Sequence, residues 1–401
     1  MPETSEADLI ENRAMWPDDF HDCIPRIEEV ARLDLDIPQD LSDRLAAEVE
    51  DLLVPASLLD ECVAALVSGN LVLQGPPGTG KSTLARALAA AFNVDLLPVT
   101  AHEDWSTFEI IGRQELRVDD DNNEEIVPVN GHFTEAVIRC AGKIPGHTDN
   151  AENPQATWLM IDELNRAHPD KAFGELFSVL GTDDPVPVTL GYQRSGNDVL
   201  VVPRRFRIVA TINSIDKQFV NALSQGLRRR FTFLTLDIPP RRVGDQSWGS
   251  DSSLATREFA VVRDRAVSRA ARRTGRDAAD LQEHMNQPGV RELMETLFEI
   301  VERVRYAGDE SFDPFIPVAT APLIDTTELY LIRAIQQDLE LLAAPDALDW
   351  AAAAKLVPLF DAGSVNRERL GNLAESLPEP FNRLTRRAML EIQSDGLFYV
   401  E

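Results

Sequence analysis

The sequence predicts an α/β fold in which a parallel sheet flanked by helices is followed by a smaller helical region. Three observations support this prediction. Short apolar runs alternate with stretches of helical spacing between residues 56 and 240. A glycine-rich turn directly follows the first of these runs. Beyond Ser253 the strand-like runs stop, and only helical spacing continues.

The 401 residues suggest about two or three domains. We expect an acidic, partly helical N-terminal extension over 1–55 and an α/β domain over 56–240. Residues 241–401 are then expected to form a helical lid and a C-terminal helical region.

The elements of the α/β domain follow from the spacing of apolar residues. A helix is expected over 56–68, where apolar side chains recur every three or four positions, and a second helix over 82–92. The five strands of the sheet are expected at 71–73, 96–99, 158–161, 206–212 and 231–236, with a helix over 171–180. Residues 186–190 and 199–202 resemble a hairpin inserted before the fourth of these strands.

The remaining segments are helical or loop-like. Helical spacing predicts helices over 254–273, 290–305, 325–342 and 350–360. The acidic run DDDNNEE at 119–125 is expected to be a solvated loop.

The net charge is −28, from 39 basic and 67 acidic residues. Such a charge repels polyanions, so direct binding of nucleic acid by the surface as a whole is not expected. Only five of the basic residues are lysines and the other 34 are arginines. Two explanations stay open: adaptation to a salt-rich cell, where salt screens the repulsion between carboxylates, and a GC-rich genome that favours arginine codons.

Composition also bears on the compartment. No apolar run approaches the roughly 18 residues of a membrane span, and the N-terminus lacks the basic and apolar regions of a signal peptide. The cysteines Cys23, Cys62 and Cys140 are scattered and form no CxxC pair, which fits a reducing compartment. We therefore expect a cytoplasmic protein without a membrane segment.

The strongest functional pattern is an octet that fits G-x-x-x-x-G-K-[ST]. Its glycines let consecutive backbone N–H groups curl around a phosphate, and the next helix points its positive end at the same group. Lys81 is expected to reach the β- and γ-phosphate oxygens, and Ser82 to offer a hydroxyl to Mg²⁺. The predicted nucleotide-binding residues are Gly75, Pro76, Pro77, Gly78, Thr79, Gly80, Lys81, Ser82 and Thr83.

Two carboxylates, Asp162 and Glu163, follow the apolar run 158–161. At the carboxyl edge of a sheet, Asp162 would hold Mg²⁺ through water and Glu163 would activate the attacking water. The alternative is that the pair is only the acidic beginning of a helix. Its position 81 residues after Lys81, two strands further along, favours the catalytic interpretation.

Polar residues at two later strands complete the pattern. Asn213 would lie between the ends of the first and third strands and orient the water, or it could simply open a turn. Arg228, Arg229 and Arg230 directly precede the last expected strand. Arginines placed across a subunit boundary can neutralise charge in a transition state, and the alternative is that these are solvated.

In this order, and with a helical region behind them, these motifs resemble an AAA+ ATPase. The stretches IDELNRAHPDKAFGELFSVL, VLVVPRRFRIVATINSIDK and ALSQGLRRRF are similar to the McrB-like, dynein-related branch, and MoxR-type ATPases are close relatives. The resemblance covers residues 55 to 240 strongly and 254 to 360 only as a lid. It implies a P-loop NTPase core with a parallel five-stranded sheet, followed by a smaller C-terminal helical lid domain.

The resemblance also implies roles for individual residues. Lys81 and Ser82 match the Walker A lysine and Mg²⁺ ligand, Asp162 and Glu163 the Walker B pair, and Asn213 the first sensor; Arg229 and Arg230 match trans-acting arginines, with Arg228 a weaker candidate. The stretch 131–134 resembles the GxFxxA segment before a helix, which the family places near the ring pore.

This sequence departs from the family's pattern in two places. Lys217 follows Asp216 where McrB-like proteins have an arginine. Residues 315–326 contain no second-sensor arginine, which leaves Arg333 as the candidate. We also expect no DNA-reading N-terminal domain of the McrB kind, because the acidic segment before the α/β domain is only 55 residues long and leaves no room for it.

The implied function is a ring-forming, hexameric NTPase that uses Mg²⁺ and ATP, with GTP as the other option, and drives a partner. In a McrB-like complex the partner would be a McrC-like nuclease subunit engaged in restriction or defence. In a MoxR-like system it would be a von Willebrand-A-type protein, and the work would be chaperone-like. A nucleotide-gated switch with little turnover is a further alternative.

One segment departs from the acidic background. Residues 257–276 contain seven arginines against two acids, Glu258 and Asp264. These arginines could contact a polyanion or an acidic partner. The favoured interpretation is that they pair with the abundant carboxylates of the protein's own surface.

Overall fold

The computed structural model describes residues 30–118, 124–174, 176, 179–180, 185, 187–192, 199–214, 224–243, 246–306, 316–361 and 367–395. The chain divides into two compact units. One, here called the α/β unit, comprises the residues up to 50, 54–75 and 81–236. The other, the helical unit, comprises 51–53, 76–80 and the residues from 237 onwards.

The α/β unit contains short helices and strands in alternation. They are α3 (Leu41–Glu48), α4 (Ala56–Ser68), β1 (Asn70–Gly75), α5 (Lys81–Ala91), β2 (Asp95–Thr100), α6 (Thr107–Ile110), β3 (Gly112–Val118), β4 (Glu124–Asn130), α7 (His132–Asp149), β5 (Thr157–Asp162), the 3-10 turn η1 (Leu164–Arg166), α8 (Pro169–Phe173), β6 (Pro187–Thr189), β7 (Val199–Val201), β8 (Ile208–Asn213), α9 (Gln225–Arg228) and β9 (Phe231–Thr235).

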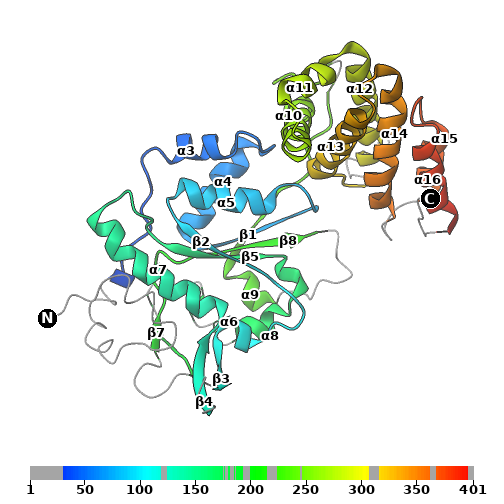
Figure 1. Ribbon diagram of the computed structural model, residues 1–401. Helices are drawn as coiled ribbons and strands as arrows, with labels where there is room; N and C mark the ends of the chain where they lie inside the picture. Colours follow the sequence, from blue (N-terminus) through cyan, green and yellow to red (C-terminus); the bar gives the residue numbers. More distant parts are fainter. Residues whose placement is uncertain are drawn as a thin grey trace. The chain divides into compact units, whose positions relative to one another are not determined.

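The main sheet has five parallel strands in the order β2-β5-β8-β1-β9, which confirms the predicted fold class. Its three central strands are buried along most of their length because helices cover both faces. Figure 1 shows α4 and α5 on one side of the sheet and α7 on the other. Because all five strands run the same way, their carboxyl ends meet at one edge, where ligands of open α/β sheets bind.

Two hairpins accompany the sheet. β6 and β7 pair antiparallel, as predicted for the segment before the fourth core strand. β3 and β4 form a second hairpin that the sequence did not predict. Glu124 and Glu125 belong to β4 and not to a solvated loop; Glu125 lies opposite Arg117, and such a cross-strand pair of opposite charges favours the strand.

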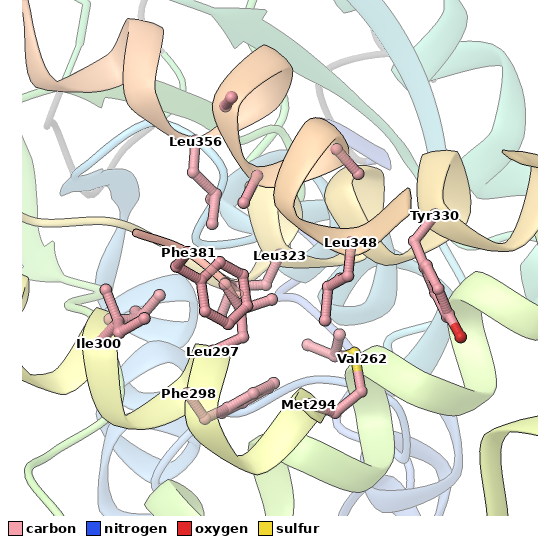
Figure 2. Close-up of a cluster of buried hydrophobic side chains, with 14 of the residues drawn as sticks. Val262, Met294, Leu297, Phe298, Ile300, Leu323, Tyr330, Leu348, Leu356 and Phe381 are labelled. Carbon is pink, nitrogen blue, oxygen red and sulfur yellow. The ribbon is translucent and has the colours of Figure 1, made fainter. Parts of the chain in front are cut away.

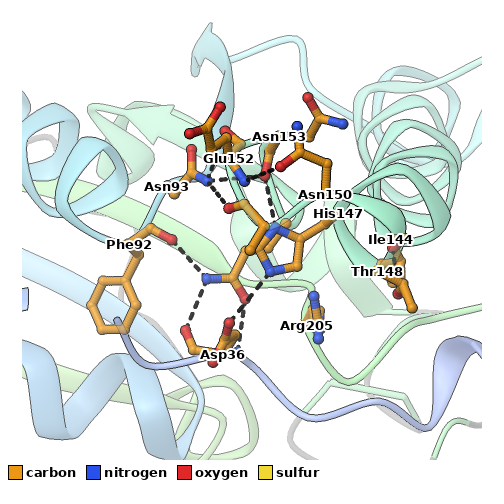
Figure 3. A network of polar contacts seen from close by, with 12 residues as sticks. Asp36, Phe92, Asn93, Ile144, His147, Thr148, Asn150, Glu152, Asn153 and Arg205 are labelled. Atoms are coloured by element: carbon orange, nitrogen blue, oxygen red, sulfur yellow. Dashed lines mark hydrogen bonds and ion pairs between the residues drawn. The ribbon is translucent and has the colours of Figure 1, made fainter. Parts of the chain in front are cut away.

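The segment before α3 is held against the rest of the α/β unit by a polar network (Figure 3). The side-chain amide of Gln155 accepts a hydrogen bond from the backbone N–H of Asp36 at 2.7 Å and donates to the carbonyls of Asp36 and Phe92 at 2.8 and 2.6 Å. The imidazole of His147 contacts the carbonyl of Asn153 at 2.7 Å and Oδ2 of Asp36 at 3.4 Å. Gln155 and His147 are both buried, so they fix the path of the backbone around Asp36.

The helical unit contains the remaining elements. They are α10 (Leu254–Thr274), α11 (Ala278–Asn286), α12 (Pro288–Arg305), α13 (Thr320–Gln336), the 3-10 turn η3 (Leu341–Ala343), α14 (Ala344–Lys355), the 3-10 turn η4 (Val357–Phe360), α15 (Arg367–Glu375) and α16 (Leu384–Asp395). The helices expected at 325–342 and 350–360 were misplaced: the first spans 320–336, and the second is a helix over 344–355 followed by a 3-10 turn.

The core of the helical unit is apolar and spans most of its helices. Figure 2 shows Leu297, Phe298, Leu323, Leu348 and Phe381 converging from different parts of the chain.

The helical unit also contains a buried ion pair. Arg305 on α12 donates two hydrogen bonds to Glu258 on α10, at 2.7 and 2.8 Å, and neither side chain is more than 3% exposed. Burial by itself would lower the pKa of Arg305, but the adjacent Glu258 carboxylate raises that pKa above its ordinary value.

Several predictions fall outside the described residues. They concern residues 1–29 of the N-terminal extension with Cys23, residues 119–123 of the acidic run, positions 175, 177 and 178 of the expected helix 171–180, Asp216 and Lys217 of the signature loop, and Phe315. None of the helices described in the structure is long and apolar enough to cross a membrane.

Candidate nucleotide-binding site

The turn between β1 and α5 has a backbone that requires glycine. Gly75, Gly78 and Gly80 have φ angles of +152°, +82° and +96°. A Cβ atom on Gly75 would lie 2.0 Å from the carbonyl oxygen of Leu236, so no side chain fits there. The octet therefore forms a glycine-dependent loop that leads into a helix, which is the backbone arrangement that binds phosphate.

Lys81 is the first residue of α5, and only 6% of it is exposed. Its ammonium donates a hydrogen bond to the carbonyl of Gly75 at 3.0 Å. The lysine is thereby folded back over its own loop, while Thr79 closes the turn by donating to the carbonyl of Pro76 at 3.0 Å. A buried ammonium beside this loop is placed to meet a phosphate.

Asp162, the last residue of β5, lies beside Ser82. The Ser82 hydroxyl contacts the two carboxylate oxygens of Asp162 at 2.8 and 3.0 Å. A second hydroxyl, that of Thr211 on β8, donates to Oδ1 of the same carboxylate. Two hydroxyls therefore fix the orientation of Asp162 next to the beginning of α5.

Glu163, the residue after Asp162, has a left-handed backbone conformation, with φ +56° and ψ +45°. Its N–H donates to Oγ1 of Thr211 at 3.0 Å. Its carboxylate is held at both oxygens: Oε1 accepts a hydrogen bond from Asn213 Nδ2 at 3.2 Å, and Oε2 forms an ion pair with Arg166. Such an uncommon backbone conformation in a non-glycine residue is typical of functional sites.

Asn213 ends β8, which pairs with β1 on one side and with β5 on the other. In the register with β1 it lies opposite Gly75. Its own N–H donates to Oδ1 of Asn165 at 3.3 Å. The predicted residues Lys81, Ser82, Asp162, Glu163 and Asn213 thus gather at one edge of the sheet, around three adjacent strands.

The three arginines lie on a separate turn, formed by α9 and the two residues after it. Arg228 and Arg229 are exposed, and Arg230 is partly buried. Arg230 donates from Nη1 to the carbonyl of Gly226 at 2.5 Å, and its own carbonyl accepts from Asn70 Nδ2 at 3.2 Å. We call residues 224–230 the arginine turn.

The residues of the sheet edge fit a nucleotide with Mg²⁺. No side chain fits at Gly75, and the hydroxyl of Ser82 and the carboxylate of Asp162 are the oxygen ligands that Mg²⁺ prefers. In the part of the chain that the structure describes, no group of three or more His, Cys, Asp or Glu could hold a metal by itself. Mg²⁺ typically keeps waters and phosphate oxygens as its other ligands, so two protein ligands are sufficient.

Comparison with known families agrees with this geometry. The profile of the AAA domain (dynein-related subfamily) matches residues 70–231, from the beginning of β1 to the beginning of β9. Residues 70–231 are an AAA domain. The match includes the glycine loop, both carboxylates, Asn213 and the arginine turn, and it confirms the predicted resemblance.

Individual relatives are similar to part of this chain. The EcoKMcrB subunit of the type IV methyl-directed restriction enzyme of Escherichia coli K12 is 28% identical over 204 residues, which are 48% of this chain and 40% of that protein. An uncharacterized protein of Staphylococcus haemolyticus is 26% identical over 175 residues, 42% of this chain and 55% of that one. The chain therefore spans about half the length of the curated relatives that it matches.

Among solved structures, a candidate ATPase from Cytophaga hutchinsonii aligns over 93% of this chain and 98% of its own, at 13% identity. The TM-score of 0.34 is too low to add to the fold assignment.

The AAA domain contains polar contacts that sequence reasoning missed. Thr211 links Asp162 to Glu163, and Asn165 and Arg166 hold Asn213 and Glu163. Threonine is an ordinary strand residue, so nothing in the pattern distinguished Thr211. The Asn-Arg pair was part of the quoted resemblance, and its position one residue beyond the two carboxylates was the signal that could have assigned it.

The arginine-rich helix pairs largely with carboxylates of its own unit, as the favoured interpretation predicted. Arg269 contacts Asp325 at 2.8 Å, Arg273 contacts Glu328 at 2.9 Å, and Arg265 contacts Asp51 at 3.0 Å. These pairs compensate much of the local positive charge.

Arg333, the candidate second sensor, lies over the ring of Trp350 on α14, with its guanidinium carbon 5.8 Å from the ring centroid. The contact is internal to the helical unit.

Burial raises the pKa of the Cys62 and Cys140 thiols to about 12, so neither is suited to nucleophilic chemistry.

Proposed function

We propose that this chain is a ring-forming AAA+ NTPase that hydrolyses ATP at the boundaries between subunits and drives a partner protein. One observation carries the proposal. The Glu163 carboxylate and Asn213 are hydrogen-bonded to each other, and Asp162 beside them is bonded to Ser82 at the phosphate-binding loop. A group that can activate water and a group that can hold Mg²⁺ therefore lie side by side at this loop.

Each residue then has a distinct task. Lys81 binds the β- and γ-phosphates, and Ser82 and Asp162 hold Mg²⁺, which when bound offsets the charge of the phosphate oxygens. Glu163 accepts a proton from the attacking water, and Asn213 orients both Glu163 and that water. Arg229 and Arg230 of a neighbouring subunit stabilise the charge of the transition state, a contribution of about 10³–10⁵ in rate.

The biological role proposed is that of a McrB-like motor subunit. The similarity to the Escherichia coli restriction subunit supports it, over about half of this chain. The corresponding partner is a McrC-like nuclease, and the ring is proposed to be a hexamer. The net charge of −28 argues against DNA being gripped by this chain alone. A MoxR-like ATPase with a von Willebrand-A-type partner is the alternative within the same branch.

A nucleotide-gated switch with little turnover is a second candidate, favoured by one contact. Arg166 pairs with Oε2 of Glu163 and thereby occupies one oxygen of the carboxylate that would activate water. The switch and the motor differ in turnover, and turnover is directly measurable.

The first experiment compares the parent protein with Glu163→Gln. Because glutamine keeps the shape but cannot accept the proton, we expect turnover to fall by about 10²–10⁴ while nucleotide stays bound. Glu391→Gln, on α16 of the helical unit, is the control and should hydrolyse normally. Turnover of ATP and GTP is measured at low and at molar salt. If Glu163→Gln hydrolyses as fast as the parent, the assignment of Glu163 is wrong.

The second experiment tests the shared site. Lys81→Ala subunits cannot bind nucleotide but keep their arginines, and Arg229→Ala/Arg230→Ala subunits have the opposite defect. Mixing the two should restore partial activity, because an intact nucleotide site then meets an intact arginine turn. The readout is turnover against mixing ratio. An absence of rescue at every ratio would show that the site is not shared.

A further inference from the structure

Asp170, in the first turn of α8, makes a two-point contact with the beginning of the arginine turn. Its Oδ2 accepts a hydrogen bond from the N–H of Ser224 at 3.0 Å, and its Oδ1 accepts one from the Ser224 hydroxyl. The two residues are 54 positions apart in the sequence. A carboxylate is suited to this contact because its two oxygens meet two donors of the same residue.

Ser224 in turn begins the helix that carries the arginines. It is the N-cap of α9, and its Oγ accepts a hydrogen bond from the N–H of Leu227 at 3.2 Å. The Ser224 hydroxyl therefore donates to Asp170 and accepts from the helix at the same time. Displacement of Ser224 would move α9 with it.

The arginine turn is held at its other end as well. The carbonyl of Arg230 accepts a hydrogen bond from Asn70, whose Oδ1 accepts another from the N–H of Ile208 on β8. Asn70 is 8% exposed, so this end is fixed to the centre of the sheet. Asp170 is accordingly the contact that sets the orientation of the opposite end.

The same stretch of chain carries Glu163 and Asp170. Glu163 is followed by η1, whose Arg166 pairs with the Glu163 carboxylate, and α8 begins three residues later. Buried side chains anchor this stretch to the core at Leu164, Ala167, Pro169, Ala172 and Phe173.

We propose that Asp170 is a positioning residue that orients the arginine turn for the nucleotide site of the neighbouring subunit. The inference rests on the proposed function, in which Arg229 and Arg230 act across a subunit boundary. In this role Asp170 acts through the arginine turn and not on the nucleotide itself. It acts in trans, although it lies seven residues after Glu163 in its own chain.

The variants follow from the geometry. Asp170→Ala removes both acceptors, Asp170→Asn replaces one oxygen by an amide that cannot accept, and Ser224→Ala removes the hydroxyl from the other partner. Because misplacement of a catalytic group by about 1 Å costs on the order of 10²-fold, we expect Asp170→Ala to lower kcat by that factor with KM changed by less than about twofold. Asp170→Asn should be intermediate. Asp149→Ala, an exposed residue at the end of α7, is the matched control and should leave kcat unchanged.

The decisive measurement is complementation in mixed assemblies of the full chain. Asp170→Ala subunits keep a nucleotide site and lack an oriented arginine turn, and Lys81→Ala subunits supply the turn. Their mixture should hydrolyse ATP faster than either variant alone by on the order of tenfold. A mixture of Asp170→Ala with Arg229→Ala/Arg230→Ala should show no gain, because neither subunit then offers a working turn.

The outcomes separate this inference from the proposed function. If Lys81→Ala rescues Arg229→Ala/Arg230→Ala but not Asp170→Ala, the shared site stands and Asp170 acts on its own subunit, which overturns the inference. If Lys81→Ala rescues neither variant, the shared site is wrong and the role of Asp170 with it. If Asp170→Ala has parental turnover, the inference is also wrong. Should Asp170→Ala fail to fold, Ser224→Ala replaces it in the same mixtures, with the same expected results.

Discussion

Asn213 donates a hydrogen bond from its side-chain amide to Oε1 of Glu163 across 3.2 Å, at the ends of adjacent strands β8 and β5. The Asn213 N–H is anchored by Asn165, and the Glu163 N–H is anchored by Thr211. Both residues of the pair are thus anchored through their backbones, and in the proposed function this anchoring orients them for hydrolysis.

Replacement of Asn213 by alanine should affect turnover and not binding. The variant leaves Glu163 without one of its two orienting partners, and loss of such a donor costs about 10²–10³ in kcat. Titration with a fluorescent nucleotide and a single-turnover assay measure the two quantities separately. The interpretation fails if the dissociation constant rises in parallel with the loss of turnover.

Replacement of Thr211 by valine should raise the Mg²⁺ requirement. Valine has the same shape but lacks the hydroxyl that donates to Asp162 and accepts from the Glu163 N–H. Loss of such a supporting contact costs roughly 10–100-fold in metal affinity. The readout is nucleotide binding at increasing Mg²⁺. Thr211→Ser keeps the hydroxyl and serves as the control; a normal Mg²⁺ requirement in Thr211→Val would contradict the role.

Arg305→Met should strongly destabilise the helical unit, because it leaves the Glu258 carboxylate buried without its cation. The expected loss is about 3–5 kcal/mol in the free energy of unfolding. Changing both residues to methionine should cost less than the single change, since no charge is then left buried. Arg387→Met, which breaks the exposed pair with Glu391, should cost below about 1 kcal/mol. Urea unfolding of the four proteins tests this order.

The stability of the helical unit should fall as the pH falls, in part because of His284. Burial lowers the pKa of this imidazole, so the unfolded chain takes up a proton at a pH where the native state does not. Its Nε2 contacts the hydroxyl of Tyr330 at 2.8 Å, while Nδ1 has no hydrogen-bond partner among the described residues. Between about pH 7.5 and 5.5, His284→Gln should therefore lose less stability than the parent protein. An equal loss in both proteins would show that His284 does not contribute.

The strands of the main sheet could be predicted because each contains an apolar run of ordinary length, and the three central strands β5, β8 and β1 are buried along most of it. The β3–β4 hairpin could not, since its strands carry charges and its apolar residues Leu116, Val118 and Ile126 are exposed. Cross-strand pairs stabilise such a hairpin, and a pattern of burial does not reveal them. The helix boundary near residue 350 failed for a related reason, because the alanine-rich stretch there has weak periodicity.

The candidate site was predictable where a residue type alone implies its chemistry. Asp162 and Asn213 end their strands, Glu163 follows one, and Lys81 begins the helix after another. Parallel strands bring such positions together. The contact between Asp170 and Ser224 was not predictable, because it joins residues 54 positions apart through packing that no local pattern encodes.

The docking of the first described segment has a consequence for the order of folding. Asp34 and Asp36 are held by Arg205 and Gln155, partners that lie 171 and 119 residues further along the chain. Contacts of such separation form only after the intervening strands have come together. Of the segments described, one of the first to be synthesised can therefore dock only after the residues before β5 and those before β8 have been brought close to it.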